Sequence, residues 1–386
     1  MTARELRLRA PTFTSVLEVG AAAPAFIGAT LDGNARYVFD SAAGRPIVIL
    51  VLGSGRWGPG AEALALLARH DHIFNDQDAT FFGVTVDPSD AGEGRIRRRI
   101  PGIRWFLDYD RKISAAFGAL SGKEGQREFT PHWLLLDTTL RVVKRAEITK
   151  GESIFAELRD MIARGPEQSH APVLVVPRVF EPEICRHLIS LYEQYGGIDS
   201  GFMRDEDGLT VAKLDHRYKR RSDFEIGDEE LRHLLGTRLR RALLPAISKT
   251  FQFNATRIER WIVACYDGEV GGFFRPHRDN TTAGTAHRKF ACTINLNAEE
   301  FEGGELRFPE FGQRTYRAPT GGAVVFSCSL LHEATPVVRG RRYAFLPFFY
   351  DDAAALLRQK NQSLLAPDWS AKVAGDGHTN AGAGAG

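Results

Sequence analysis

The chain has 386 residues, of which 43% are hydrophobic and 25% are charged, as in ordinary soluble globular proteins. This length favours two domains. A formal net charge of +2 gives no reason to expect nucleic acid or an anionic membrane as a partner. Residues Met1–Gly20 lack the apolar region of a secretory signal, and the most apolar run, Pro46–Leu52, is too short to span a bilayer. We therefore expect a cytoplasmic protein.

From Leu17 to Ala163, strand-like and helix-like patterns alternate, which predicts an α/β domain over residues 17–163 with a mostly parallel central sheet. The continuous apolar run Pro46–Leu52 is typical of a strand covered on both faces. Further strands are expected at Thr80–Val86, Trp133–Asp137 and Leu140–Ile148, and helices at Ala61–Phe74 and Glu152–Ala163.

A polar linker is predicted at Arg164–Ala171, after which the pattern changes. An amphipathic helix at Pro182–Tyr195 precedes short β-rich runs separated by Gly, Pro and Asn, which indicates a β-sandwich or jelly roll with flanking helices. These runs are Arg257–Asp267, Arg288–Asn297, Gly304–Phe308, Ala323–Ser327 and Arg342–Phe349, and a further strand is expected before the helix at Leu174–Val179. The Ala/Gly-rich segment 371–386 is predicted to be disordered.

No cysteine occurs before Cys185, and none of the four belongs to a CxxC pair. Three of them, Cys265, Cys292 and Cys328, are inside apolar, strand-like runs; the fourth is Cys185. This pattern predicts buried, reduced thiols with no disulfide framework.

The segment Tyr266–Asp279 (YDGEVGGFFRPHRD) contains a candidate metal site. One His-x-acid pair is expected by chance in such a chain, but residues i and i+2 of an extended segment face the same side, so His277 and Asp279 can reach one cation. His332, at the end of the apolar run AVVFSCSLLH, supplies a third ligand. Two histidines and one carboxylate leave one face of an octahedron open, as an oxygen-activating Fe(II) requires.

A candidate anchor for a small dicarboxylate follows at Arg341 and Arg342, the start of the strand-like run RRYAFLPFFY. A guanidinium grips a carboxylate through two hydrogen bonds. Tyr266 can add a phenolic hydrogen bond.

These residues resemble the 2-oxoglutarate- and Fe(II)-dependent dioxygenases of the prolyl 4-hydroxylase-like superfamily. The resemblance covers Pro172–Asp352 and implies a double-stranded β-helix over residues 172–352. Its motifs occur in the family's order: YDGE from Tyr266, Phe274, HRD at 277–279, INLN at 294–297, GGELRF at 303–308, HEATPV at 332–337, and Arg342.

The resemblance implies that His277, Asp279 and His332 bind Fe(II). It also implies that Arg342 holds the distal carboxylate of 2-oxoglutarate, with Tyr266 assisting; Arg341 stays open as an alternative anchor. The implied enzyme is a hydroxylase that consumes O2, releases succinate and CO2, acts on a peptidyl (prolyl-type) or small-molecule substrate, and uses ascorbate. The presence of Asp279 argues against a halogenase, whose chemistry needs a halide at that position.

The first domain resembles a peroxiredoxin or thioredoxin-like domain. The resemblance lies in the strand Pro46–Leu52, the turn Trp57–Gly60 before a helix, and Pro131, at the place of that fold's cis-proline. Residues 1–184 contain no cysteine, so thiol catalysis is excluded here. We expect a docking, substrate-presenting or supporting role instead.

Two functional hypotheses follow for the whole chain. The first is a hydroxylase; the second is a sensor or docking protein that binds iron and 2-oxoglutarate without turnover. The complete set of ligands favours the first. The prime substrate is not identified, because substrate choice lies in loops such as Gly197–Arg221.

Overall fold

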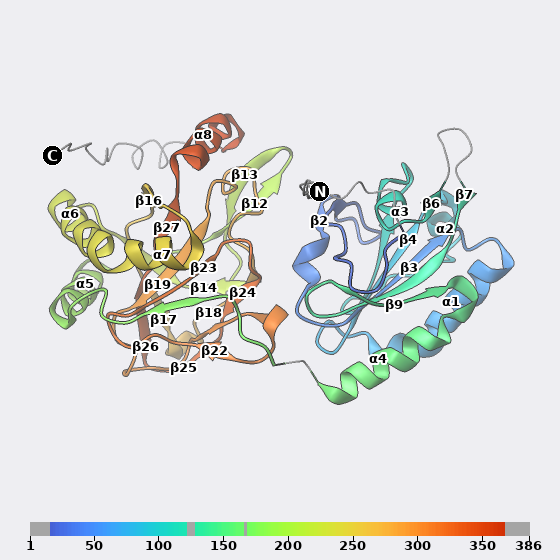
Figure 1. Cartoon of the computed structure of the whole chain (residues 1–386), viewed down its shortest axis with the longest axis horizontal. Coiled ribbons are helices and arrows are strands. Elements are labelled where there is room, and N and C mark those ends of the chain that lie inside the picture. Colours follow the sequence, from blue (N-terminus) through green and yellow to red (C-terminus); the bar gives the residue numbers. More distant parts are fainter. Residues whose placement is uncertain (1–15, 122–127, 166–167, 367–386) are drawn as a thin grey trace, which may run out of the picture. The chain divides into compact units, whose positions relative to one another are not determined.

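The computed structural model describes residues 16–121, 128–165 and 168–366, whose elements are labelled in Figure 1. Contacts between residues divide the chain into two compact units. The first unit comprises Met1–Ser169 together with Pro309–Gln313, and the second comprises His170–Phe308 with Arg314–Gly386. The segment 371–386, for which disorder is predicted, lies outside the described residues.

The first unit contains a five-stranded sheet with the order β5-β4-β3-β8-β9. The first three of these strands are parallel to one another, and β8 and β9 are antiparallel to their neighbours. This is the thioredoxin-like topology. The bounds are β3 Ile47–Gly53, β4 Thr80–Thr85, β5 Ile103–Leu107, β8 His132–Leu136 and β9 Val142–Glu147. The edge elements are β1 Ile27–Gly28, β2 Tyr37–Val38, β6 Leu120–Ser121 and β7 Glu128–Phe129.

The central strands of this sheet are buried on both faces, as their continuous apolar sequences predict. On one face, helices α1 (Gly58–His70) and α4 (Glu152–Arg164) bury an apolar stripe against it. On the other face the packing is aromatic, with Phe39, Phe82 and Phe106 in mutual contact. Two short helices complete the unit, α2 (Pro88–Gly92) and α3 (Lys112–Ala116).

The expected cis-proline at Pro131 is wrong. Among the described residues the cis peptide bond is Ile100–Pro101. The trans bond at Pro131 carries the chain from β7 directly into β8, and the amide of Thr130 donates to the carbonyl of Ala119 at 2.8 Å.

The second unit is a double-stranded β-helix. Its larger sheet has nine strands along the path β10-β23-β19-β26-β17-β15-β11, with β16 and β27 beside it. Its smaller sheet has the order β14-β18-β24-β21-β22. The larger sheet comprises β10 Leu174–Val176, β11 Ile198–Asp199, β15 Ser222–Glu225, β16 Arg257–Glu259, β17 Ile262–Asp267, β19 Phe290–Asn295, β23 Ala323–Ser327, β26 Arg341–Phe345 and β27 Phe348–Tyr350.

The smaller sheet comprises β14 Lys219–Arg220, β18 Phe273–His277, β21 Leu306–Arg307, β22 Thr315–Tyr316 and β24 His332–Ala334. The unit also contains two separate two-stranded sheets. One pairs β12 Phe202–Glu206 with β13 Leu209–Lys213, and the other pairs β20 Glu302–Gly303 with β25 Val337–Arg339. The β12–β13 hairpin lies within the segment expected to be a substrate loop.

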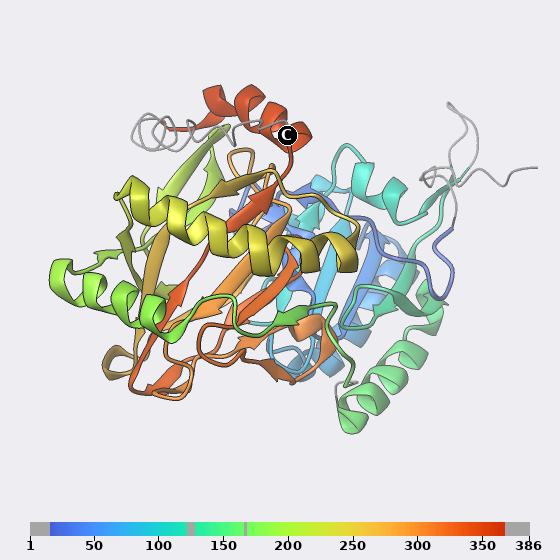
Figure 2. The same ribbon diagram turned by 60° about the vertical axis from the view of Figure 1, so that its left-hand side comes forward.

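Helices cover one face of the larger sheet (Figure 2). They are α5 (Pro182–Tyr195), α6 (Glu229–Arg238) and α7 (Leu244–Phe251), the last two joined by a π-helical turn at Leu239–Leu243. Helix α8 (Asp352–Lys360) follows the last strand. No described helix combines the length and apolarity needed to cross a membrane. All four cysteines are buried free thiols, which confirms the predicted burial.

The larger sheet has two chemically different faces because side chains alternate along each strand. Cys265, Ile294 and Tyr343 belong to the core formed with the helices. Their strand neighbours Tyr266 and Arg342 face the other way, into the interior between the sheets, and are register partners across β17 and β26. This inner face holds the candidate site.

Candidate metal centre

Three potential metal ligands come together at one end of the smaller sheet. Strands β18 and β24 are antiparallel neighbours in which His277 is the register partner of His332. A bulge between Phe274 and His277 redirects the end of β18. Asp279 lies just past that end, where its amide donates to the carbonyl of Cys328 at 2.9 Å. The extended backbone of residues 277–279 places two of the ligands on one side, and the pairing of β18 with β24 brings His332 beside them.

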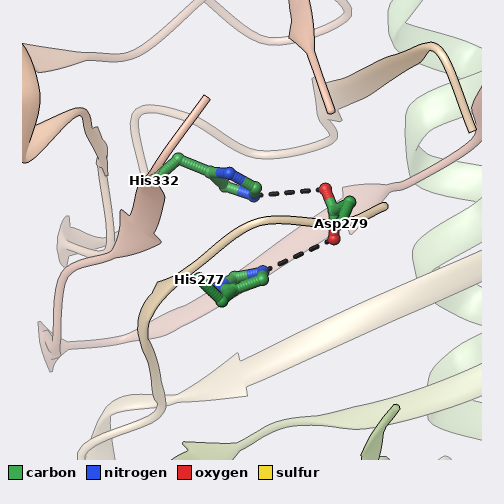
Figure 3. A group of neighbouring side chains, drawn as sticks. All are labelled: His277, Asp279 and His332. Atoms are coloured by element: carbon green, nitrogen blue, oxygen red, sulfur yellow. Dashed lines mark ion pairs between the residues drawn. The ribbon is translucent and has the colours of Figure 1, made fainter. Parts of the chain in front are cut away.

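The carboxylate of Asp279 lies between the two imidazoles (Figure 3). Its Oδ1 is 3.5 Å from Nε2 of His277, and its Oδ2 is 3.3 Å from Nε2 of His332. One ligand atom from each residue lies within 4.8 Å of the others. Within the described ranges, this is the one group of three or more metal-binding side chains so arranged.

Backbone carbonyls fix the tautomer of both histidines. Nδ1 of His277 is 2.8 Å from the carbonyl oxygen of Arg275, and Nδ1 of His332 is 2.9 Å from that of Leu330. A carbonyl only accepts, so each Nδ1 carries the proton and donates it. Each Nε2 faces Asp279 and is the nitrogen that a metal ion would bind, which is the arrangement of metal-binding imidazoles.

The charge states of two of these residues suit a divalent cation. Burial and the nearby His332 lower the pKa of His277 to about 4. Burial acts to raise the pKa of the Asp279 carboxyl, but the two histidines outweigh it and hold that pKa well below its usual value. A neutral imidazole and an ionised carboxylate are the forms that bind metal. Two nitrogen donors and one carboxylate fit Fe(II) with open positions.

Apolar rings surround the imidazoles. Phe274 stacks on His277, with ring centroids 3.5 Å apart, and Phe326 lies 4.5 Å from His332. Glu333, the residue after His332, forms an ion pair with Arg307 and is not a member of the three-residue group. The rings restrict the imidazoles and limit the access of water.

A buried guanidinium lies on the inner face of the larger sheet. Arg342 is 3% exposed, donates from Nη2 to Oγ1 of Thr293 at 2.8 Å, and lies with Cζ 5.0 Å from the centre of the Tyr266 ring. No carboxylate among the described residues is within ion-pair distance of it. Burial lowers the pKa of this guanidinium. A buried cation without an anionic partner is costly, which is the property expected of an anion-binding group.

Its neighbour Arg341 faces the other way. The Arg341 side chain is 51% exposed and pairs with Asp267 at 2.9 Å. Of the two arginines left open by the sequence, only Arg342 is directed into the interior.

Sequence reasoning did not identify a second buried polar group on the same inner face. Arg221 donates from Nη1 to the Tyr266 hydroxyl at 3.4 Å and pairs with Asp223 at 2.7 Å. Lys219 is buried beside them. The one available signal was their spacing, every second residue of the run KRRSD.

Comparisons with known proteins agree with this geometry. A sequence profile described as 2OG-Fe(II) oxygenase superfamily matches residues 261–350. A PKHD-type hydroxylase of Paracoccus denitrificans (strain Pd 1222) is 38% identical over 209 residues, which cover 51% of this chain and 81% of the relative. The chain belongs to the 2OG-Fe(II) oxygenase superfamily. It is accordingly an oxidoreductase of the hydroxylase type, and the family implies Fe(II), 2-oxoglutarate and O2.

Solved structures resemble each unit separately. A prolyl-4-hydroxylase of Pseudomonas putida is similar to the oxygenase unit, with 18% identity and a TM-score of 0.37, over 47% of this chain and 94% of that chain. A peroxidoxin, BcpB of Mycobacterium tuberculosis, is similar to the other unit, with 16% identity and a TM-score of 0.31, over 38% of this chain and 98% of that chain.

Proposed function

We propose that this protein hydroxylates a C–H bond of a peptidyl (prolyl-type) or small-molecule substrate, with release of succinate and CO2 from 2-oxoglutarate. One observation carries the proposal: Arg342, a buried guanidinium with no carboxylate partner among the residues that the structure describes, shares the interior of the β-helix with three converging metal donors. A cation that lacks an anion suits the binding of a carboxylate co-substrate.

In this proposal His277, Asp279 and His332 hold the iron, each histidine through Nε2. When bound, iron supplies O2 activation coupled to the oxidative decarboxylation of 2-oxoglutarate. The protein supplies orientation: the carbonyls of Arg275 and Leu330 keep both Nδ1 atoms protonated, so the imidazoles cannot turn away.

Arg342 and Thr293 hold the distal carboxylate of 2-oxoglutarate, and Tyr266 lines the same space. The ring of Phe274 limits water around His277. Ascorbate belongs to the proposal as the reductant that keeps iron ferrous. A cytoplasmic location is also part of it, because four buried free thiols suit a reducing compartment.

The first unit takes a docking or substrate-presenting role in this proposal. It lacks cysteine, so the start of helix α1 has no thiol to activate. The residue at that helix start, Trp57, is 40% exposed. An exposed indole suits a contact with a partner.

The test is the formation of succinate from 2-oxoglutarate by the full chain, loaded anaerobically with Fe(II) and then exposed to O2. We expect iron- and O2-dependent succinate in wild type and only background in His277→Ala and Asp279→Ala. His233→Ala, which removes an exposed histidine from α6, is the matched control and should retain activity.

The outcomes separate the two hypotheses for the chain. Iron and 2-oxoglutarate binding without turnover, even with candidate substrates added, would favour a sensor or docking protein over a hydroxylase. Absence of iron binding by the wild-type chain would refute the metal site itself.

A further inference from the structure

Three charged residues at every second position face the interior of the β-helix. Lys219 is the register partner of Phe274 in the smaller sheet, and Asp223 is the partner of Ala264 in the larger one. Phe274 and Ala264 both belong to the interior apolar cluster that also contains Tyr266. Since alternate residues of an extended strand share a side, Arg221 lies between them on the same inner face.

The Lys219 ammonium is beside the candidate iron ligands. Its Nζ donates to Oγ of Ser200 at 2.7 Å and to the carbonyl of Gly201 at 2.6 Å, and lies 4.9 Å from the centre of the Phe274 ring. That same ring stacks on His277. Lys219 and His277 therefore contact one common side chain.

The Arg221 guanidinium is beside Tyr266, the aromatic neighbour of the candidate anchor Arg342. It is 7% exposed, pairs through Nη2 with Asp223 and Ser200, and reaches the Tyr266 hydroxyl through Nη1. Across the part of the chain that the structure describes, Nε of Arg221 and Oδ1 of Asp223 have no hydrogen-bond partner although both are buried. Buried polar atoms are almost always bonded, so the unpaired Nε donor of Arg221 indicates an acceptor supplied by a ligand.

The cluster also has an excess of positive charge. Arg260 contacts the same Asp223 oxygen at 3.2 Å, so Arg221 and Arg260 share one carboxylate, and Lys219 adds a third cation beside them. Burial, reinforced by Arg221, lowers the pKa of Lys219 well below its usual value. Desolvated cations are stable only when paired, and no second carboxylate among the described residues pairs with Lys219 or Arg221.

We propose that Lys219 and Arg221 form a subsite for a carboxylate of the prime substrate. The inference deepens the proposed function and rests on it: the subsite lies between Phe274, which stacks on a metal ligand, and Tyr266, which borders the co-substrate anchor. It assigns the substrate to carboxylate-bearing molecules, such as a free amino acid or another small organic acid, in preference to the neutral interior of a peptide. Arg342 stays the partner of 2-oxoglutarate.

The test measures binding of acetate, with its neutral isostere acetamide as the reference, by saturation-transfer NMR on the full chain at saturating 2-oxoglutarate. We expect acetate to bind and acetamide to give little signal. Lys219→Met should weaken acetate binding about tenfold, the loss expected for a hydrogen bond between charged groups. Lys219→Arg keeps the charge and should keep most of the affinity.

Two further variants locate the bound acetate. Lys213→Met removes an exposed lysine of β13 and should change nothing. Arg342→Met should leave acetate binding in place, because the subsite is distinct from the co-substrate anchor. Thermal unfolding of Lys219→Met should show a melting temperature equal to or above that of wild type, since a buried charge is replaced by an apolar side chain.

Three results would overturn the proposal: equal signals for acetate and acetamide, unchanged acetate binding in Lys219→Met, or loss of binding in Arg342→Met with retention in Lys219→Met. None of these binding measurements requires iron or turnover. Failure of the subsite is therefore distinguishable from failure of the proposed function, which the succinate assay reports.

Discussion

Arg341 and Arg342 are chemically identical neighbours with opposite environments. Strand β26 directs Arg342 inward to Thr293 and Tyr266, whereas Arg341 reaches solvent and pairs with Asp267. An exposed ion pair contributes little to stability or function, whereas a buried guanidinium depends on the anion that it binds. The side of the strand on which each arginine lies therefore determines which of them can serve as the proposed anchor.

This difference gives a matched pair of substitutions. Arg342→Met should raise the KM for 2-oxoglutarate about tenfold or more, because it removes charged hydrogen bonds to a carboxylate. Arg342→Lys should give a KM between those of wild type and Arg342→Met, since a lysine keeps the charge but cannot form the two parallel hydrogen bonds of a guanidinium. Arg341→Met should leave that KM almost unchanged. Succinate formation over a range of 2-oxoglutarate concentrations measures all three, and a larger effect at Arg341 would contradict the assignment.

At the scale of elements, a buried carboxylate ties strand β16 to the segment before β19. Glu259 accepts from Arg288 at 2.6 Å and from His287 at 2.6 Å, and all three are buried. Burial acts to raise the pKa of Glu259, but Arg288 and His287 outweigh it and hold that pKa well below its usual value. The ionised carboxylate therefore stabilises the folded state.

Glu259→Gln should lower the free energy of unfolding by about 3 kcal/mol at pH 7, because it leaves Arg288 buried without a counter-charge. Since the folded-state pKa is depressed, this stabilisation is present above the unfolded pKa and disappears as pH falls through the folded value. The difference from wild type should thus shrink below about pH 4. Urea unfolding of both proteins at pH 7 and in acid measures this difference in the free energy of unfolding.

The exposed Glu229, in the first turn of α6, provides the control. Glu229→Gln should change the free energy of unfolding by less than about 0.5 kcal/mol, as is usual for surface positions. An equal loss in both variants would mean that Glu259 does not act through its buried pair.

Helix α5 was predictable from sequence because its apolar stripe is local and Pro182 marks its start. Helices α6 and α7 were not predicted. Gly236 and Pro245 interrupt the pattern there, and the structure accommodates the proline by placing a π-helical turn, Leu239–Leu243, before it. Such a compensation depends on packing against the sheet, which a local pattern does not contain.

The candidate site likewise contains some residues that the sequence could identify and others that it could not. His277, Asp279 and His332 belong to short motifs, so sequence alone brought them forward as candidate ligands. Lys219 and Arg221 belong to a charged run that resembles a solvated surface. Their burial follows from pairing with strands more than forty residues away, as at Phe274 and Cys265, and no local signal specifies such pairing.

At the scale of the whole molecule, the two units differ in thiol content. All four cysteines lie in the oxygenase unit and are buried; Cys185 belongs to helix α5, and Cys265 packs in the core that the helices cover. Burial raises the pKa of each of these two thiols to about 11. A buried, protonated thiol is a poor nucleophile.

The native chain should therefore react very slowly with Ellman's reagent at pH 8, whereas four thiols should titrate after unfolding in urea. The same property predicts no thiol-dependent consumption of hydrogen peroxide by the folded protein. Absorbance at the thionitrobenzoate band follows the first reaction. Rapid labelling of even one thiol in the native state would contradict the burial described for these residues.

The alternation of side chains in the larger sheet also has a consequence for protein engineering. Residues such as Cys265, Ile294 and Tyr343 pack in the core that the helices cover, and their strand neighbours Tyr266 and Arg342 face the interior of the β-helix. A library of variants restricted to the helix-facing residues would alter thermal stability. A library restricted to the inward-facing residues would alter substrate selectivity. Deleting a single residue within β26 would turn part of that strand to the opposite face and so impair both properties together.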